Sequence, residues 1–324
     1  MTNRSISNTI EIVTPAPAGS LHGNRMTALR WEQFFKKFGL SVHVSESWSE
    51  HPVDLLIALH AYRSHQSIKL FKNRCPQKPI VLVMTGTDLY RDLQIHPEVI
   101  ESMAIADAIV VLQSSALASI PRAFQNKTHV IYQSIKPIKR QSLLKTSFLV
   151  SVIGHLRPEK DPFCTAKALA LLPNSSTVQV IHLGKAMEDD MNRQALLFAD
   201  TTSRYQWLGE LSHEETLAHL SRSHLMVISS LMEGGAHVVS EAISAGVPVI
   251  ASDIPGNRGL LGEDYPGYYS VGNEVELAKL LQRAETQPEF YQALEQGIKA
   301  RQKYVQPEFE QESLEKLLLA LLPQ

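Results

Sequence analysis

Short apolar runs alternate with helical patterns along the first 135 residues of the chain. The runs are rich in β-branched residues and are bounded by chain breakers, which is the pattern of buried strands. The predicted strands are Ile10–Thr14, Ser41–Ser45, Asp54–Leu59, Ile80–Met84, Ala108–Leu112 and Val130–Tyr132. Strands separated by helices favour a parallel sheet with right-handed crossovers.

The segment between the first two strands predicts an amphipathic helix. Asn24 is a plausible N-cap for it, and Gly39 a plausible end. Four apolar residues recur at helical spacing and give the helix one buried face: Ala28, Trp31, Phe35 and Phe38.

The same rhythm restarts after a segment with the character of a linker, Lys136–Ser147. This segment holds Pro137 and four basic residues, Lys136, Lys139, Arg140 and Lys145. The strands predicted beyond it are Phe148–Ile153, Val178–Leu183, Tyr205–Leu208, Leu225–Ser229 and Val247–Ala251. We therefore predict two doubly wound α/β domains, residues 1–140 and 141–305, with a cleft between them. A leucine-rich helix from about Glu308 to Leu322, within a segment 306–324, is expected to pack back across both.

The composition argues against several classes of protein. The chain has 324 residues, 44% of them hydrophobic, and a formal net charge of −2, so it lacks the strong positive field that nucleic-acid binding usually needs. Its two cysteines, Cys75 and Cys164, lie far apart, which argues against a thiolate zinc site and favours a reducing cytoplasm. No apolar run reaches the roughly 18 residues of a membrane span, and the first residues lack the apolar core of a signal peptide. These features predict a cytoplasmic protein.

Ligands of open α/β sheets bind beyond the carboxyl ends of the strands, so candidate chemistry is sought in the loops there. The first loop runs from Pro15 to Arg25 and carries Gly19 and Gly23. Its glycines permit close backbone approach, and a following helix N-terminus with Arg25 could hold an anion. The alternative is a plain glycine turn with a solvated Arg25.

A second loop, from Thr85 to Arg91, leaves the strand Ile80–Met84. Gly86 permits a sharp turn, and the side chains of Thr85, Thr87 and Asp88 could bind a polar ligand. Thr87 or Asp88 could equally cap a helix, and the two roles are compatible.

Two further residues follow the strand Asp54–Leu59. His60 and Arg63 lie just past its end. A lone histidine in such a place is more often structural than catalytic. Together with Arg25 and Arg91, however, these residues predict a cluster of positive charge at the strand ends of the first domain.

The third loop follows the strand Phe148–Ile153 and contains Gly154, Arg157 and Lys160. Two cations three residues apart could clamp a diphosphate without a metal. A solvated surface pair of basic residues is the alternative.

The fourth loop is the most informative. After the strand Leu225–Ser229, the glycines Gly234 and Gly235 predict a turn, a helix is expected to begin near His237, and Gly246 should end it. Glu233 precedes this helix and Glu241 lies one turn inside it. A carboxylate would repel a diphosphate, so Glu241 calls for a ligand that carries hydroxyl groups. The alternative makes Glu241 an ordinary surface residue.

The series Gly154, Arg157, Lys160 followed by Glu233-x7-Glu241 resembles the donor site of family 4 retaining glycosyltransferases of GT-B architecture, over the whole second domain. The resemblance implies a nucleotide-sugar donor domain, in which Arg157 and Lys160 neutralise the diphosphate and Glu241 holds the ribose hydroxyls. It also implies that Glu233 and the backbone after it meet the transferred sugar and the phosphates, and that Leu208 and Gly209 meet the base. The donor-contacting backbone is that of Gly234, Gly235, Ala236, His237 and Val238.

Longer segments in both domains resemble the selenosugar synthases of selenoneine biosynthesis. These segments are GNRMTALRW, LLIALHAYRS, TGTDLYRDL, GHLRPEKDPF, WLGEL, MEGGAHVVSEA and DYPGYY. The resemblance implies transfer from a UDP-sugar, of the UDP-N-acetylglucosamine or UDP-glucose type, to selenophosphate. An anomeric carbon–selenium bond forms and UDP and phosphate are released. It further implies a functional link to a selenophosphate synthase and a selenoneine synthase.

Selenophosphate is a soft, anionic nucleophile, so the first domain should supply a cationic acceptor site more than a base. The expected acceptor-binding residues are Gly23, Asn24, Arg25, Arg63, Thr85, Gly86, Thr87 and Arg91. The expected catalytic residues are Arg25, Asp88 and His60. No Asp-x-Asp follows a strand, so we expect neither a metal nor a cofactor. Two alternatives stay open: transfer to a hydroxyl acceptor with Asp88 or His60 as the base or as an orienting group, and a non-catalytic binder of nucleotide-sugars.

Overall fold

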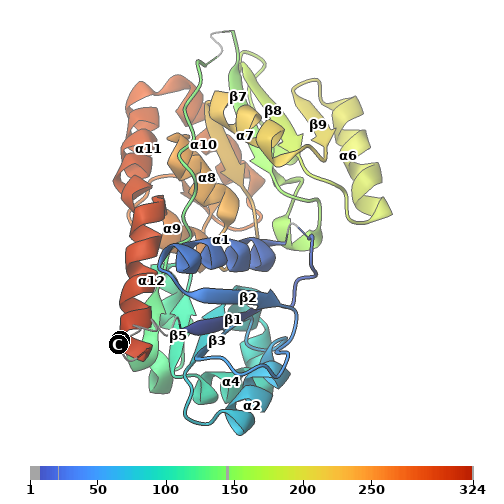
Figure 1. Ribbon diagram of the computed structural model, residues 1–324. Helices are drawn as coiled ribbons and strands as arrows, with labels where there is room; N and C mark the ends of the chain where they lie inside the picture. Colours follow the sequence, from blue (N-terminus) through green and yellow to red (C-terminus); the bar gives the residue numbers. More distant parts are fainter. Residues whose placement is uncertain (1–7, 21, 144–145, 323–324) are drawn as a thin grey trace. The chain divides into compact units, whose positions relative to one another are not determined.

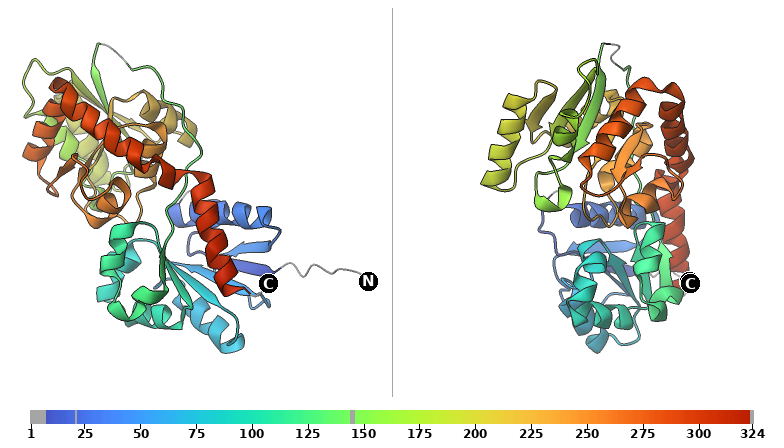
Figure 2. Two further views of the ribbon diagram at one scale, coloured as in Figure 1. Left: turned by 90° about the vertical axis from the view of Figure 1, so that its left-hand side faces the viewer. Right: turned by 180° about the vertical axis from the view of Figure 1, so that it is seen from behind.

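The computed structural model describes residues 8–20, 22–143 and 146–322. The chain divides into two compact units, Met1–Gln133 with Glu308–Gln324 and Ser134–Pro307 (Figure 1). This division differs from the predicted bounds in two ways. The change of unit falls at 133/134 rather than at 140/141, and the C-terminal helix belongs to the first unit. In each unit a parallel sheet has helices on both faces (Figure 2), so the α/β class with two doubly wound sheets is confirmed.

The first unit contains a six-stranded sheet of order β2-β1-β3-β4-β5-β6. Its strands are β1 (Thr9–Val13), β2 (Ser41–Ser45), β3 (Leu55–Leu59), β4 (Ile80–Met84), β5 (Ala108–Val111) and β6 (Thr128–Val130). Its α-helices are α1 (Gly23–Lys37), α2 (His65–Arg74), α3 (Thr87–Tyr90), α4 (Pro97–Ile105) and α12 (Pro307–Leu321). Short 3₁₀ turns complete it at Asp92–Gln94, Ser114–Ser119 and Arg122–Lys127.

The central strand β3 explains why this sheet is buried on both faces. Successive side chains of a strand point to opposite faces, so a strand covered on both sides is apolar throughout. Leu55, Ile57 and Leu59 enter the core beneath α1 and α12. Leu56 and Ala58 enter the core beneath α2 and α4 on the other face.

The helix α1 begins at Gly23, two residues earlier than a cap at Asn24 requires. His22 occupies the N-cap and Asn24 lies inside the first turn, so the predicted Asn24 cap is wrong. The end at Gly39 is confirmed: Gly39 has φ 80° and donates to the carbonyl of Lys36, while Leu40 donates to that of Phe35. These two bonds form a Schellman motif, which needs a left-handed residue at this place.

The second unit contains a six-stranded sheet of order β12-β11-β10-β7-β8-β9. Its strands are β7 (Phe148–Ile153), β8 (Val178–Leu183), β9 (Tyr205–Gly209), β10 (Leu225–Ile228), β11 (Val249–Ser252) and β12 (Tyr268–Tyr269). Its α-helices are α5 (Cys164–Leu169), α6 (Asp189–Thr201), α7 (His213–Arg222), α8 (His237–Ala245), α9 (Pro255–Leu261), α10 (Glu274–Thr286) and α11 (Pro288–Arg301). Two 3₁₀ turns lie at Pro158–Lys160 and Gln302–Val305.

Most predicted strands are found within a residue or two of their expected bounds. Val130–Tyr132 is displaced by two residues at each end and so overlaps β6 by one residue only. The strand β12 was not predicted, because two residues are too short for a periodic pattern. The predicted linker also differs, in that its described residues pack on the second unit. Ile138 donates its N–H to Ser244 Oγ, and Gln141 donates its N–H to the carbonyl of Ser221. Lys145 of that segment lies outside the described residues.

Candidate functional site

The strand order of the second unit locates its ligand crevice. The chain builds outward from β7 through β8 to β9, as Figure 1 shows. It then continues on the other side of β7 with β10. Ligands of open α/β sheets bind where the order reverses, beyond the carboxyl ends of the two central strands. The loops after β7 and β10 hold Lys160 and Glu233, so both predicted residues lie at this switch point.

Lys160 and Glu233 form an ion pair that joins these two loops. The Lys160 ammonium group contacts Oε1 of Glu233, and the side chains are 22% and 11% exposed. Ser230 Oγ donates to the same carboxylate at 2.6 Å. Ser229 Oγ donates to the carbonyl of Lys160 at 2.9 Å. The positive charge of Lys160 is therefore held in place at the crevice by a carboxylate.

Three glycines bring the loops after β7, β8 and β9 into contact. Gly184 donates to the carbonyl of Gly209 at 2.7 Å and has φ 151°. A Cβ on Gly184 would lie 1.9 Å from the carbonyl oxygen of Gly154. Only glycine therefore fits at this close approach. Gly184 was missed by the sequence analysis, although its place at the end of a predicted strand was a usable signal.

A pocket of about 340 Å³ opens beside these loops. Its wall includes Lys185 from the loop after β8, together with Trp207, Gly209 and Glu210 from the end of β9. The indole N–H of Trp207 donates to the carbonyl of Gly184 at 2.8 Å and holds this ring in place. Of the two residues predicted to contact the base, Gly209 thus lines a pocket.

The surroundings of Gly154 are electrostatically positive. Burial lowers the pKa of His155, and the charges of Arg157, Lys160 and Lys185 lower it further, against the opposing effect of Glu210. Arg157 is exposed, and Lys160 is half-buried. Lys185 was not identified from the sequence, although it too follows a predicted strand.

The helix α8 has the predicted bounds: it runs over His237–Ala245, and Gly246, in the left-handed conformation, ends it. Gly234 and Gly235 lie in the half-buried turn before it, Ala236 is its N-cap, and Val238 is half-buried. Glu241 is only 6% exposed, so the alternative of a surface residue is wrong.

The buried carboxylate of Glu241 has a partner that the sequence analysis missed. His213, the first residue of α7, contacts Oε1 with Nε2 at 2.7 Å, and His237 Nδ1 lies 3.8 Å from the same oxygen. The hydrogen bond to Glu241 raises the pKa of His213. His213 follows the predicted strand Tyr205–Leu208, and this position near a strand end was the signal that could have identified it.

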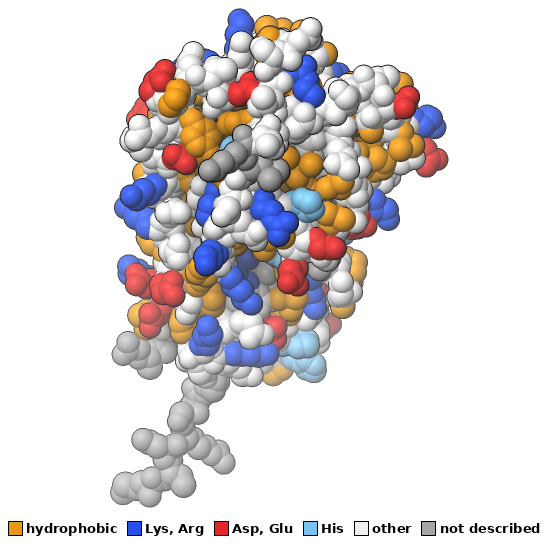
Figure 3. All heavy atoms as spheres, turned by 90° about the horizontal axis from the view of Figure 1, so that it is seen from above, with side chains coloured by type: hydrophobic (Ala, Val, Ile, Leu, Met, Phe, Trp, Pro, Cys, Tyr) orange, Lys and Arg blue, Asp and Glu red, His pale blue; other side chains and the backbone are white. Residues whose placement is uncertain are grey.

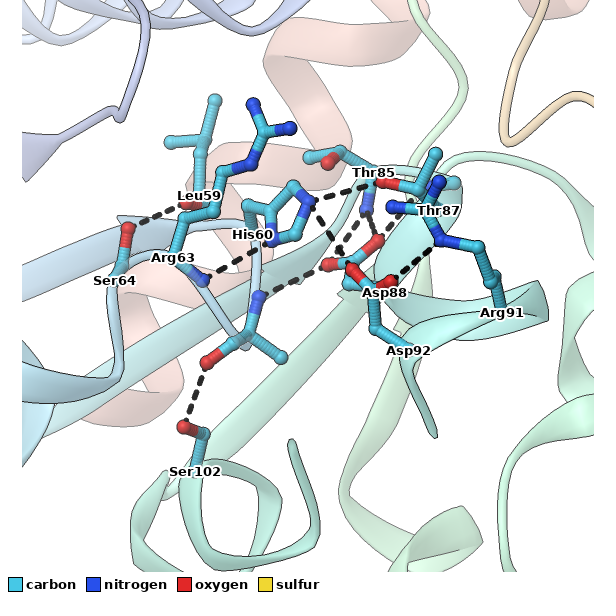
Figure 4. Close-up of polar contacts among 12 residues, drawn as sticks. Leu59, His60, Arg63, Ser64, Thr85, Thr87, Asp88, Arg91, Asp92 and Ser102 are labelled. Carbon is cyan, nitrogen blue, oxygen red and sulfur yellow. Dashed lines mark hydrogen bonds and ion pairs between the residues drawn. The ribbon is translucent and has the colours of Figure 1, made fainter. Parts of the chain in front are cut away.

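In the first unit the order reverses between β1 and β3, and the predicted residues again follow these strands and β4. Asp88 is fully buried. Its carboxylate accepts the backbone N–H groups of Thr85 at 2.9 Å, Gly86 at 2.8 Å and Ala61 at 3.0 Å (Figure 4). Both oxygens are thus engaged in tying the loop after β4 to the loop after β3. Asp88 therefore positions the two loops, and its expected catalytic role stays a prediction.

His60 is also buried, at 2% exposure, and has the unusual φ of 76°. Nδ1 accepts the N–H of Arg63 at 3.3 Å, and Nε2 lies 3.0 Å from Thr87 Oγ1 and 3.7 Å from Asp92 Oδ2 (Figure 4). Because Nδ1 accepts, the ring proton lies on Nε2, which donates to Thr87. Burial lowers the pKa of His60, which favours this neutral form. The ring therefore holds the hydroxyl of Thr87 in place, and the expected catalytic role of His60 stays a prediction.

The three predicted arginines of this unit gather at one edge of the sheet. Arg25, Arg63 and Arg91 follow β1, β3 and β4, which are neighbours in a parallel sheet. Arg63 is exposed, and Arg91 is 49% exposed while its Nε contacts Asp92 Oδ1 at 2.8 Å. Arg25 is half-buried in the first turn of α1, where its Nε lies without a hydrogen-bond partner. The remaining predicted acceptor residues lie at the same edge: Gly23, Asn24, Thr85, Gly86 and Thr87. Leu21 of the first loop lies outside the described residues.

Further properties bear on the class of site. Within residues 8–20, 22–143 and 146–322 no group of three or more His, Cys, Asp or Glu side chains could hold a metal ion. None of the helices in the described part of the chain is long and apolar enough to cross a membrane. On the face drawn in Figure 3, basic and acidic side chains are interspersed, as expected for a net charge of −2.

Comparison with known proteins agrees with this architecture. Residues 134–301, just over half of the chain, match the family model "Glycosyl transferases group 1". The chain therefore belongs to this family and is a glycosyltransferase. Its two sheets are those of the GT-B fold.

Solved structures show the same fold. The complex of Anabaena Alr3699/HepE with UDP and glucose has a TM-score of 0.73 at 16% identity, over 97% of this chain and 100% of that one. Sucrose-phosphate synthase of Thermosynechococcus elongatus has a TM-score of 0.79 at 15% identity, over 97% and 99%. The lipopolysaccharide outer core galactosyltransferase WaaB has a TM-score of 0.70 at 14% identity, over 97% and 100%. A comparison with curated protein sequences gives no match.

Proposed function

We propose that the second unit is the donor domain and binds a UDP-sugar at the switch point beyond β7 and β10. The observation that carries this proposal is the buried carboxylate of Glu241 beside the start of α8. A buried carboxylate needs hydrogen-bond donors, and the hydroxyl groups of a ribose supply them. Structures of the same fold contain UDP, or UDP-glucose, as in Alr3699/HepE.

Charge on the leaving diphosphate is the main demand that the reaction makes of this domain. Arg157, Lys160 and Lys185 supply positive charge around Gly154, and the N-terminus of α8 adds free N–H groups. The ion pair with Glu233 fixes the ammonium group of Lys160 before the substrate binds. Preorganisation of this kind spares the reorganisation that flexible lysines require. The donor would bind without a metal or a cofactor.

The acceptor in this proposal is selenophosphate, bound by the first unit. The long segments that resemble selenosugar synthases support it, as do the three arginines at one sheet edge. Selenium attacks the anomeric carbon, the bond from that carbon to the UDP oxygen breaks, and UDP leaves with the electron pair. Water then cleaves the phosphorus–selenium bond, which releases phosphate and a sugar that carries selenium. Asp88 and His60 are buried, so neither offers a base to a sugar hydroxyl. A nucleophile that is already anionic needs none.

The test is a reaction of the purified protein with a UDP-hexose and selenophosphate in the presence of EDTA. We expect release of UDP and phosphate, together with a product that shows the selenium isotope pattern in mass spectrometry. Phosphate is the matched control, because it should compete for the acceptor site without reacting. UDP release that needs an alcohol acceptor would instead assign transfer to a hydroxyl group. Titration of UDP in EDTA separates the donor half of the proposal, which fails if no binding is observed.

A further inference from the structure

The contact between His213 and Glu241 joins two elements that the nucleotide proposal treats separately. His213 is the first residue of α7 and is itself 64% exposed, whereas the side chain of Glu241 on α8 is 8% exposed. Both histidine contacts of Glu241 run to Oε1. Oε2 takes part in neither contact and is the oxygen that these histidines leave for a ligand.

We propose that His213 is a positioning residue for nucleotide binding, which fixes the carboxylate of Glu241 so that its second oxygen accepts the ribose hydroxyls. The inference rests on the proposed function, because it needs a nucleotide at this site. It adds a residue outside the glycine turn and the Glu233-x7-Glu241 series. Glutamate has several rotatable bonds, so a partner that holds one oxygen lowers the entropy lost when the other oxygen binds a ligand.

The electrostatic setting of His213 makes this positioning dependent on pH. The helix α7 packs against α8 and β7. The strand β7, of sequence FLVSVI, has no titratable side chain, and α8 contributes His237 and Glu241. On its own helix His213 is followed by Glu214, Glu215 and His219, and Glu215 is engaged by the N-cap Ser212. The hydrogen bond to Glu241 raises the pKa of His213 above its ordinary 6.5.

The preference for a nucleotide with ribose hydroxyls should weaken as the pH rises. Below its pKa, His213 donates a charge-assisted hydrogen bond and offsets the repulsion between Glu241 and the diphosphate. As the pH rises through that pKa, which lies above 6.5, the bond loses its charge. The preference for a nucleotide with ribose hydroxyls should fall in the same range.

The experiment compares the affinities of UDP and 2′,3′-dideoxy-UDP by calorimetry between pH 6 and pH 9. The ratio of the two affinities reports the ribose hydroxyls alone, because titration of the phosphates affects both ligands equally. We expect the wild-type protein to prefer UDP by about tenfold at pH 6 and by less at pH 9. His213→Ala should reduce the preference to less than about threefold at every pH, through weaker UDP binding with unchanged dideoxy-UDP binding.

Two further variants separate positioning from a structural role. His213→Gln keeps a hydrogen-bond donor but cannot titrate, so it should retain most of the preference and lose its pH dependence. His219→Ala, on the same helix, should behave as the wild type. The inference is overturned if His213→Ala keeps the wild-type preference or if it weakens both nucleotides equally. Wild-type protein that binds neither nucleotide would refute the proposed donor site itself, and that result is distinct from either of these.

Discussion

The indole N–H of Trp31 donates to Oε1 of Glu310 at 2.7 Å, although the two residues are 279 positions apart. Arg30, the neighbour of Trp31 on α1, donates two hydrogen bonds of 2.8 and 3.0 Å to the same carboxylate. Glu310 is fully buried on α12. Three donors from α1 thus hold the C-terminal helix on the sheet of the first unit.

We predict that Glu310→Ala destabilises the protein by about 3 kcal/mol, because it leaves the Arg30 charge and the Trp31 N–H without their acceptor. Urea denaturation of the intact chain, followed by tryptophan fluorescence, measures the change in the transition midpoint. Glu315→Ala is the matched control, since Glu315 is an exposed residue of the same helix. Equal midpoints for the two variants would contradict the role assigned to the buried carboxylate.

Substitutions in the two units should separate nucleotide binding from turnover. Glu241→Ala should weaken UDP binding by roughly 1.5–3 kcal/mol, the contribution of hydrogen bonds to a charged group. Arg25→Ala should leave UDP affinity nearly unchanged and abolish turnover, because Arg25 lies at the sheet edge of the other unit. Calorimetry and a UDP-release assay measure the two effects. The division of labour is wrong if both variants lose nucleotide affinity to the same degree.

A buried histidine predicts a loss of stability in acid. His182 on β8 is 1% exposed, and its Nδ1 lies 2.8 Å from the hydroxyl of Tyr205. Burial lowers the pKa of His182 to about 4 from 6.5. Between these values the unfolded chain binds a proton that the folded chain does not. The free energy of unfolding therefore falls as the pH decreases from 6.5 towards 4, by up to about 3 kcal/mol.

The measurement is the free energy of unfolding between pH 7 and pH 5 for the wild type and for His182→Gln. The variant should be less stable at pH 7 but should have a flatter dependence on pH. The exposed His51 supplies the control, since His51→Gln should keep the wild-type slope. A slope that His182→Gln leaves unchanged would assign the acid sensitivity to other groups.

Local sequence patterns were sufficient to predict the helices and strands that carry the candidate site. The bounds of α8 followed from two glycines before it and Gly246 after it, since these residues act within one turn of chain. The apolar run of β4 likewise marked a buried strand with its correct bounds. The loops that hold Lys160, Glu233 and Arg91 could therefore be placed at strand ends without knowledge of the strand order.

Roles that depend on surroundings could not be assigned in the same way. Asp88 and His60 have the chemistry of catalytic groups, and only the packing showed that backbone N–H groups and Thr87 occupy them. His213 belongs to no motif that the sequence shows. Its role depends on contact with the carboxylate of Glu241, which lies 28 residues further along the chain.

The sequence by itself determined which segments become strands and helices, because the period of apolar residues is a local property of the chain. Tertiary structure decided the order of the strands, and with it the switch point where Lys160 meets Glu233 across 73 residues. It also decided that α12 completes the first unit rather than the second. Strand order and helix docking depend on which distant apolar faces cover one another and which buried charges find partners. Several arrangements can satisfy the same local pattern, and only the folded chain selects one of them.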